Sequence, residues 1–228
     1  MSKLEIKNLT MSYGKKVLDN LNLDLDRGQI VGLVGPNGSG KSTLLRILAG
    51  LEKTYKGKVL INGEEINYKT AAIVSYQADK FTLSNKLSIK GVVNTYKKFF
   101  KDFDENKFYK LLEDFNLPTK AKVKELSKGA REKLQIALSL SRKAEIFLLD
   151  EPISGVDPSA RKTIIKMILN NFEKDSLIIV STHLINQIEP LLDRVVFLSE
   201  GKIYLNKTVD EIRRENNMSL EDYFTEVF

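Results

Sequence analysis

A short glycine-rich segment constrains the fold of this chain more than any other feature of its sequence. The segment reads Gly35-Pro36-Asn37-Gly38-Ser39-Gly40-Lys41-Ser42. A continuous apolar run, residues 30–34, precedes it, and an apolar stretch over residues 42–49, closed by Gly50, follows it. Such a run is typical of a strand covered on both faces, and a glycine often ends a helix. The sequence therefore predicts a buried strand, a tight turn and a helix in direct succession.

The same segment matches a phosphate-binding loop. Its glycines let the backbone wrap around an anion without Cβ collisions, so that successive N–H groups and the positive end of the next helix point at the phosphate. Lys41 would reach the β and γ phosphates of a nucleotide, and the Ser42 hydroxyl would bind Mg²⁺. A plain glycine-rich turn is the alternative, which the flanking strand and helix disfavour. The predicted nucleotide-binding residues here are Gly35, Pro36, Asn37, Gly38, Ser39, Gly40, Lys41, Ser42 and Thr43.

A second apolar run, residues 146–149, ends in two adjacent carboxylates, Asp150 and Glu151. Two buried carboxylates are costly unless something pairs with them. A magnesium ion and a water molecule would do so, with Asp150 holding the metal and Glu151 polarising the attacking water. The alternative is that the two carboxylates form a capping or salt-bridged pair. It is less well supported, because a phosphate-binding loop occurs earlier in the same chain.

The remaining periodicity indicates strands that alternate with helices. Alternating leucines at 21, 23 and 25 are typical of half-buried antiparallel strands, and Asn62-Gly63 after residues 59–61 indicates a hairpin. Further strands are expected at 73–75, 177–180 and 195–198, and Asp157-Pro158 is typical of a helix start. From about residue 88 to 143 the apolar spacing becomes helical, as in Ile89, Val92, Val93, Tyr96 and Phe99. The chain is thus expected to be α/β, with a largely parallel sheet and a helical insertion.

Composition narrows the function less than the motifs do. The 228 residues include no cysteine, which excludes disulfides and thiolate metal sites and fits a reducing compartment. Residues 1–5 lack the apolar core of a secretory signal, and no apolar run approaches the length of a spanning helix. The net charge of +6 fits nucleic acid, an acidic membrane or phosphorylated ligands as partners, and equally a solvated surface.

With both motifs in this order, the chain resembles the ATP-binding-cassette (ABC) family of nucleotide-binding domains over nearly its whole length. The resemblance implies that Tyr13 stacks on adenine and that Gln77 contacts Mg²⁺ and responds to a membrane partner. It further implies that His183, the only histidine, senses the γ-phosphate. Ser154-Gly155-Val156-Asp157 matches the loop that crosses between paired domains.

The family signature is expected at Leu126-Ser127-Lys128-Gly129-Ala130, before a helix that begins near Arg131. The usual form is Leu-Ser-Gly-Gly-Gln, so Lys128 replaces a glycine and Ala130 replaces the glutamine. Ser127 and Gly129 remain, and the resemblance implies that they bind the γ-phosphate of ATP held by a second subunit. Arg131 would lie at the helix start, where a cation favours phosphate. The departure puts fast turnover in doubt more than ATP binding.

The resemblance also implies the organisation of the protein. The expected fold is a P-loop NTPase with a RecA-like core, an antiparallel β subdomain and an inserted α-helical subdomain, as one domain over residues 1–228. The core with the β subdomain would take about 1–86 and 144–208, the helical subdomain about 87–143, and a helical tail about 209–228. The expected cofactors are ATP and Mg²⁺, with Lys41, Glu151 and His183 as catalytic residues and Ser42, Gln77 and Asp150 as metal ligands.

The implied partners are a separate transmembrane subunit and a second nucleotide-binding domain, in a homodimer or a heterodimer. No nucleic acid is expected, and the implied location is cytoplasmic, on the inner face of the cell membrane. The tail, Met218-Ser219-Leu220-Glu221-Asp222-Tyr223-Phe224, resembles the end of ATPases that serve ABC-2-type exporters of Gram-positive bacteria. Export of peptides or antimicrobial compounds is therefore the preferred function.

Two other classes of function were weighed. A soluble ABC ATPase in iron–sulfur assembly, translation or repair would share these motifs. Tyr96-Lys97-Lys98-Phe99-Phe100-Lys101 mixes bases with aromatics as single-strand binders do, although its apolar members also fit the buried face of a helix. A P-loop kinase or GTPase is less well supported, and the guanine-reading Asn-Lys-x-Asp of a GTPase is missing from the sequence.

Overall fold

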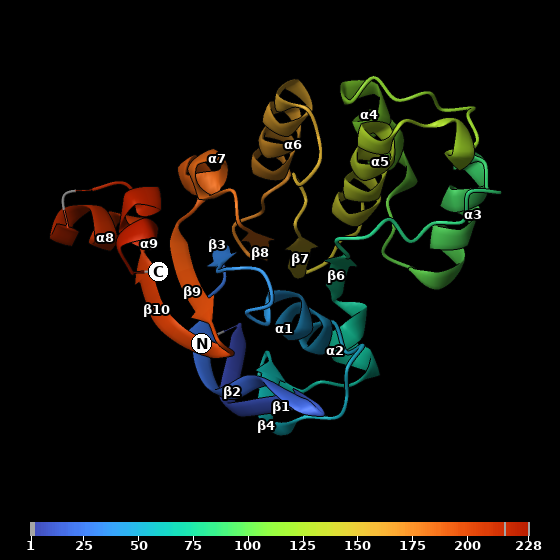
Figure 1. The fold of residues 1–228 in the computed structure, drawn as a ribbon. Coiled ribbons are helices and arrows are strands. Elements are labelled where there is room, and N and C mark those ends of the chain that lie inside the picture. Colours follow the sequence, from blue (N-terminus) through green and yellow to red (C-terminus); the bar gives the residue numbers. More distant parts are fainter. Residues whose placement is uncertain (1–2, 217, 228) are drawn as a thin grey trace.

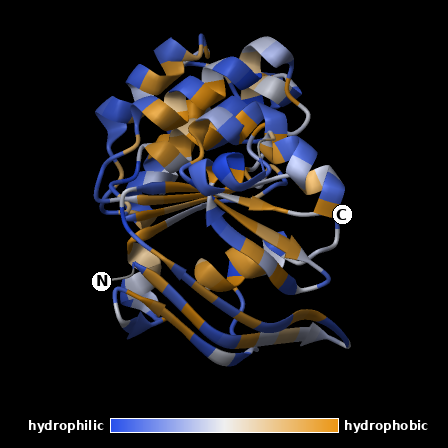
Figure 2. Ribbon diagram, turned by 90° about the vertical axis from the view of Figure 1, so that its left-hand side faces the viewer, coloured by the Kyte–Doolittle hydropathy of each residue, from blue (hydrophilic) through white to orange (hydrophobic). Residues whose placement is uncertain are grey.

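The computed structural model describes residues 3–216 and 218–227. No secretory signal is expected over residues 1–5, and two of these, Met1 and Ser2, lie outside the described residues. Its centre is a six-stranded sheet in the order β10-β9-β3-β8-β7-β6, in which β10 alone runs antiparallel to its neighbour. The strands are β3 (Gln29–Val34), β6 (Val74–Gln77), β7 (Ile146–Asp150), β8 (Leu177–Thr182), β9 (Arg194–Ser199) and β10 (Lys202–Thr208). The four inner strands, β3, β7, β8 and β9, are mainly hydrophobic, as expected of strands covered on both faces (Figure 2).

A second sheet lies below the first and is antiparallel throughout (Figure 1). Its order is β2-β1-β4-β5, formed by β1 (Leu4–Tyr13), β2 (Lys15–Leu25), β4 (Lys56–Ile61) and β5 (Glu64–Glu65). Helix α1 (Lys41–Leu48) lies between the two sheets, and its leucines join a core with apolar residues from both. This packing fixes the start of α1 directly after β3, at the edge where the parallel strands end.

The other face of the central sheet carries the helices of the middle block (Figure 1). They are α3 (Ile89–Phe99), α4 (Glu105–Asp114) and α5 (Lys128–Leu140), with a 3-10 turn at Val123–Glu125. Each helix begins at a side-chain cap: Ser88 accepts from Gly91 N–H, Asp104 from Lys107 N–H, and Ser127 from Ala130 N–H. Helix α6 (Pro158–Asn170) lies beside α5 and starts at the Asp157 cap, as predicted.

The C-terminal segment packs against the sheet through α8 (Val209–Asn216) and α9 (Leu220–Val227). Helix α7 (Ile185–Ile188) and a 3-10 turn, Glu189–Leu191, lie between this segment and β8. The rings of Tyr223 and Phe224 lie 6.0 and 5.1 Å from the ring of Phe197 in β9. The predicted aromatic tail is therefore part of the core rather than a free extension. Of the helices in the described residues, none combines the length and the apolar character that crossing a membrane requires.

The predicted fold class is confirmed, including the antiparallel sheet and the helical insertion. Several local expectations were wrong. Helix α2 (Tyr68–Ala72) was not predicted. Strand β6 begins at Val74 rather than at the predicted residue 73, because this helix precedes it. Helix α5 begins at Lys128 rather than near Arg131, because Ser127 caps it. Phe99 does not join the buried stripe of α3: it is 72% exposed, whereas Ile89, Val92 and Val93 are fully buried.

Candidate active site

The loop between β3 and α1 has a backbone that requires glycine. A Cβ added at Gly35 would lie 1.9 Å from the carbonyl oxygen of Leu198, so no side chain fits there. Gly40 caps α1 with a φ of 107°, a conformation that L side chains rarely adopt. The loop therefore lies close to β9 and leads directly into the N-terminus of α1. This is the backbone arrangement expected of a phosphate-binding loop.

Lys41 folds back over this loop. Its Nζ donates to the carbonyl oxygens of Gly35 at 2.8 Å and Pro36 at 3.1 Å, and the residue is only 6% exposed. Burial lowers the pKa of the ammonium group, and the charges of Glu151 and Asp150 oppose that shift. A buried ammonium group held only by two neutral carbonyls gains from a phosphate anion, which supplies the missing negative charge.

Asp150, at the end of β7, is held by hydroxyl groups from two other elements. Its Oδ1 accepts hydrogen bonds from Ser42 Oγ of α1 at 3.1 Å and from Ser181 Oγ of β8 at 2.5 Å. Asp150 is 1% exposed. The register explains the second contact, because Asp150 is paired with Ser181 across the parallel strands β7 and β8. The two residues predicted to bind magnesium, Ser42 and Asp150, thus come together.

Glu151 follows immediately in a strained backbone conformation. Its φ of 49° lies in the left-handed region, which a residue other than glycine adopts at a cost of about 1–3 kcal/mol. Its N–H donates to both the carbonyl oxygen and the hydroxyl of Ser181, at 3.1 Å each. Nδ1 of His183 lies 3.1 and 3.0 Å from the two carboxylate oxygens. The turn therefore directs Glu151 to the histidine at the end of the neighbouring strand.

These residues border a depression of about 230 Å³ at the edge where the parallel strands end. Besides Val17, it is lined by Asn37, Gly38, Gly40, Lys41, Ser42, Thr43 and Glu151. The predicted nucleotide-binding loop, the lysine and the general base therefore surround one cavity. Its phosphate-binding backbone, cationic lysine and carboxylate suit the hydrolysis of a nucleotide phosphate.

A magnesium ion fits the donor set beside this depression. Serine hydroxyl, carboxylate and amide oxygens are the hard ligands that Mg²⁺ prefers. Gln77, the last residue of β6, is 5% exposed, and its Oε1 has no hydrogen-bond partner among residues 3–216 and 218–227. An unpaired amide oxygen that is buried costs free energy, and a cation or its bound water would remove that cost. Ser42 and Asp150 would hold the ion, with Gln77 as the additional oxygen donor.

Three predicted site residues lie elsewhere. Ser127 and Gly129 sit at the start of α5, and within the described part of the chain neither lines the depression. Gly129 instead faces the loop after Glu151, where its Cβ position is 3.8 Å from Val156. Tyr13, at the end of β1, is 52% exposed. A hydrogen bond to Glu52 is the main cause that raises the pKa of its phenol.

Arg131 and Lys128 both lie in the first turn of α5, within or directly after the signature. The guanidinium of Arg131 donates to the carbonyl oxygens of Leu126 and Lys124, at 3.1 and 3.2 Å. It therefore stabilises the turn before α5, and its expected preference for phosphate stays a prediction. Lys128 is 75% exposed in its side chain, and its Nζ lies 3.9 Å from Glu132 Oε1. A Cβ at Gly155 would lie 2.4 Å from that Nζ, so the lysine covers the loop over residues 154–157.

Two residues beside the site were missed in the sequence. Ser181 holds both Asp150 and the backbone of Glu151, and the Tyr76 hydroxyl lies 3.5 Å from Asp150 Oδ2. The sequence does carry a signal for Ser181, because Ser181-Thr182-His183 turns polar after a run of four apolar residues at 177–180. Tyr76 has no such signal, since its role depends on the pairing of β6 with β7.

Comparisons with known proteins agree with this geometry. A family model described as ABC transporter matches residues 18–154. The chain is 32% identical to the lantibiotic transport ATP-binding protein SrtF of Streptococcus pyogenes over 211 residues, which is 91% of both proteins. It is 37% identical to the ABC transporter ATP-binding protein MJ1023 of Methanocaldococcus jannaschii, over 93% of this chain and 80% of the archaeal protein.

A solved structure described as the ATP binding subunit of an ABC transporter superposes with a TM-score of 0.87 at 26% sequence identity, covering 99% of both chains. The family model alone spans more than half of the sequence, and the relatives extend the similarity across nearly all of it. The chain therefore belongs to the ABC transporter family, as an ATP-binding and ATP-hydrolysing P-loop protein.

Proposed function

We propose that this ABC ATPase powers the export of a peptide or antimicrobial compound through a separate transmembrane subunit, from the inner face of the cell membrane. The similarity to the streptococcal lantibiotic transport protein carries the proposal, because it extends over 91% of both chains. It covers the helical block as well as the nucleotide site, and the helical block is the part expected to meet a transmembrane partner.

In this mechanism the loop over residues 35–40 and the N-terminus of α1 bind the phosphates of ATP. Lys41 exchanges its two carbonyl partners for the β and γ phosphates. Ser42, Asp150 and Gln77 provide oxygen ligands for Mg²⁺, which would neutralise charge on the phosphates. Tyr13 stacks on the adenine. Each of these groups binds ATP in the ground state and contributes to affinity.

Hydrolysis requires a water molecule in line with the γ-phosphate. Glu151 accepts a proton from that water, and His183 fixes the carboxylate through Nδ1 and provides a second polar group near the γ-phosphate. Ser127 and Gly129 of a second nucleotide-binding domain complete the site from the opposite side. This arrangement accounts for their placement outside the depression formed by their own chain.

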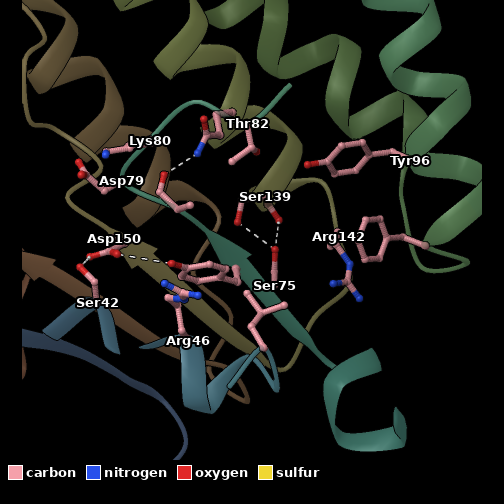
Figure 3. Close-up of a pocket in the computed structure, with 15 residues that line it drawn as sticks. Ser42, Arg46, Ser75, Asp79, Lys80, Thr82, Tyr96, Ser139, Arg142 and Asp150 are labelled. Atoms are coloured by element: carbon pink, nitrogen blue, oxygen red, sulfur yellow. Dashed lines mark hydrogen bonds between the residues drawn. The ribbon is translucent and has the colours of Figure 1, made fainter. Parts of the chain in front are cut away.

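The surface proposed to meet the transmembrane subunit borders a cavity of about 540 Å³ between the central sheet and the helical block. Ser42 and Asp150 lie at one end of the cavity, and Tyr96 and Arg142 lie at the other (Figure 3). Leu51 on its lining is 60% exposed, and Phe99, next to the lining residue Phe100, is 72% exposed. Large exposed apolar side chains beside a cavity are typical of an interaction site.

A site-specific crosslink tests the proposal. A photoreactive phenylalanine analogue at Phe99 should crosslink to a multi-span membrane protein in membranes that contain the complete transporter. The same analogue at Tyr204 of β10, which is 53% exposed at the opposite edge of the central sheet, is the matched control and should not. Crosslinks from position 99 only to ribosomal or soluble scaffold proteins would contradict transport and favour the soluble class of ABC ATPases.

A further inference from the structure

The cavity beside the helical block reaches the carboxylate assigned to magnesium, and Tyr76 lines the cavity next to that carboxylate. Tyr76 and Asp150 both line this cavity, together with Tyr96 and Arg142 at its far end (Figure 3). A group that enters this end of the cavity would contact the ring of Tyr76. The ring is therefore placed to connect the proposed docking surface with the nucleotide site.

The strand register determines this geometry. Tyr76 of β6 pairs with Leu148 of β7, and Asp150 lies two residues further along β7. Because side chains alternate along a strand, Leu148 and Asp150 project from the same face of the sheet as Tyr76. Tyr76 and Leu148 both pack in the core that contains α1, which identifies this face as the one toward α1 and Ser42. Ser75 bonds to Ser139 of α5, on the opposite face.

The two oxygens of Asp150 are held differently. Oδ1 accepts from Ser42 at 3.1 Å and from Ser181 at 2.5 Å. Oδ2 is 3.5 Å from the Tyr76 hydroxyl, its one side-chain donor within the described residues. A contact of that length is weak. Oδ2 is thus the oxygen with unused capacity for a metal or a metal-bound water, and the Tyr76 hydroxyl is the side-chain donor beside it.

We propose that Tyr76 is a positioning residue, whose hydroxyl orients the Asp150 carboxylate for magnesium. This inference rests on the proposed role of Asp150 as a magnesium ligand. Groups that hydrogen-bond to a metal-binding carboxylate orient it, and their loss weakens metal affinity about 10- to 100-fold. A tyrosine hydroxyl carries its proton at neutral pH, so it can donate to the carboxylate.

The experiment compares Tyr76→Phe with Tyr96→Phe in the full chain. Both variants remove one hydroxyl from the lining of the same cavity, and Tyr96 lies at the end away from Asp150. Binding of a non-hydrolysable ATP analogue is first titrated in EDTA. In a second titration the analogue concentration is fixed and the Mg²⁺ concentration is varied. We expect Tyr76→Phe to raise the Mg²⁺ midpoint about tenfold, the low end for such a loss, with wild-type affinity in EDTA. Tyr96→Phe should match the wild type in both titrations.

An unchanged Mg²⁺ midpoint in Tyr76→Phe would overturn the inference while leaving the magnesium assignment intact. An equal shift in Tyr96→Phe would also overturn it, because the effect would then belong to the cavity as a whole. If binding of the ATP analogue by the wild type does not depend on Mg²⁺, Asp150 is not a magnesium ligand. The inference about Tyr76 then fails as well, because it rests on that role of Asp150. Thermal unfolding of each variant excludes a loss of fold as the cause of a shift.

Discussion

Nδ1 of His183 lies 3.0 Å from one carboxylate oxygen of Glu151 and 3.1 Å from the other. The two residues follow β8 and β7, which are neighbours in the central sheet. An ionised carboxylate only accepts hydrogen bonds, so the Nδ1 atom carries the proton in this pair and Nε2 is left for another partner. The carboxylate is therefore suited to hold a water molecule, and the imidazole would donate to a phosphate oxygen through Nε2 when both ring nitrogens carry protons.

Lys41→Ala should weaken ATP binding about 10- to 100-fold, the effect of losing a charged hydrogen bond of roughly 1.5–3 kcal/mol. Lys41 Nζ donates to two neutral carbonyl oxygens, which a phosphate anion would replace with a charged partner. Titration of nucleotide binding measures the effect. Lys53→Ala, at an exposed position after α1, is the control and should bind normally. Unchanged affinity in Lys41→Ala would remove the lysine from the phosphate site.

Lys128→Gly should change ATP turnover a few-fold at low salt, with the difference fading as the ionic strength rises. The reason is that Nζ lies over Gly155, in the loop that the family resemblance places between paired domains, so its charge adjoins the second subunit's ATP. Lys128→Met keeps the apolar stem without the charge and should behave like the glycine variant. Equal rates for all three proteins at every ionic strength would show that the lysine only faces solvent.

Glu145→Gln should destabilise the fold at neutral pH by about 1 kcal/mol, a small value because the carboxylate is partly exposed. Lys3 is fully buried and is bonded to Glu145, and this hydrogen bond is the main cause that lowers the pKa of Glu145 below its ordinary 4.5. The stabilisation is fully present above about pH 4.5 and is lost as the pH falls through the lower folded-state value. Melting curves of both proteins should differ at pH 7 and converge in acid. A constant difference across that range would contradict the assignment.

The sequence predicts the parts of the site that are local in the chain. The loop, Lys41 and Ser42 follow from one strand-turn-helix segment, and Asp150 and Glu151 follow from the end of another strand. Each depends on a few consecutive residues and the backbone that they require. The same holds for the Asp157 cap of α6, which the structure contains.

Contacts between strands were not predictable in this way. Ser181 and Tyr76 reach Asp150 from β8 and β6, on either side of β7, and nothing along the chain states that order. Helix α2 was missed because it spans only five residues and depends on the capping box of Asn67 and Thr70. Phe99 has helical spacing with the buried stripe of α3, yet that helix ends there and its last residue reaches solvent.

The central claim is that Glu151 is the general base of ATP hydrolysis, and Glu151→Gln tests it directly. Glutamine keeps the shape of the side chain but not the basic carboxylate, so the loss affects the transition state more than ATP binding. We expect hydrolysis to fall by roughly two to four orders of magnitude, with ATP affinity close to that of the wild type. Light scattering should also detect an ATP-dependent dimer of the variant, if the chain pairs with itself. Turnover near the wild-type rate would contradict the claim and would transfer the positioning of water to His183.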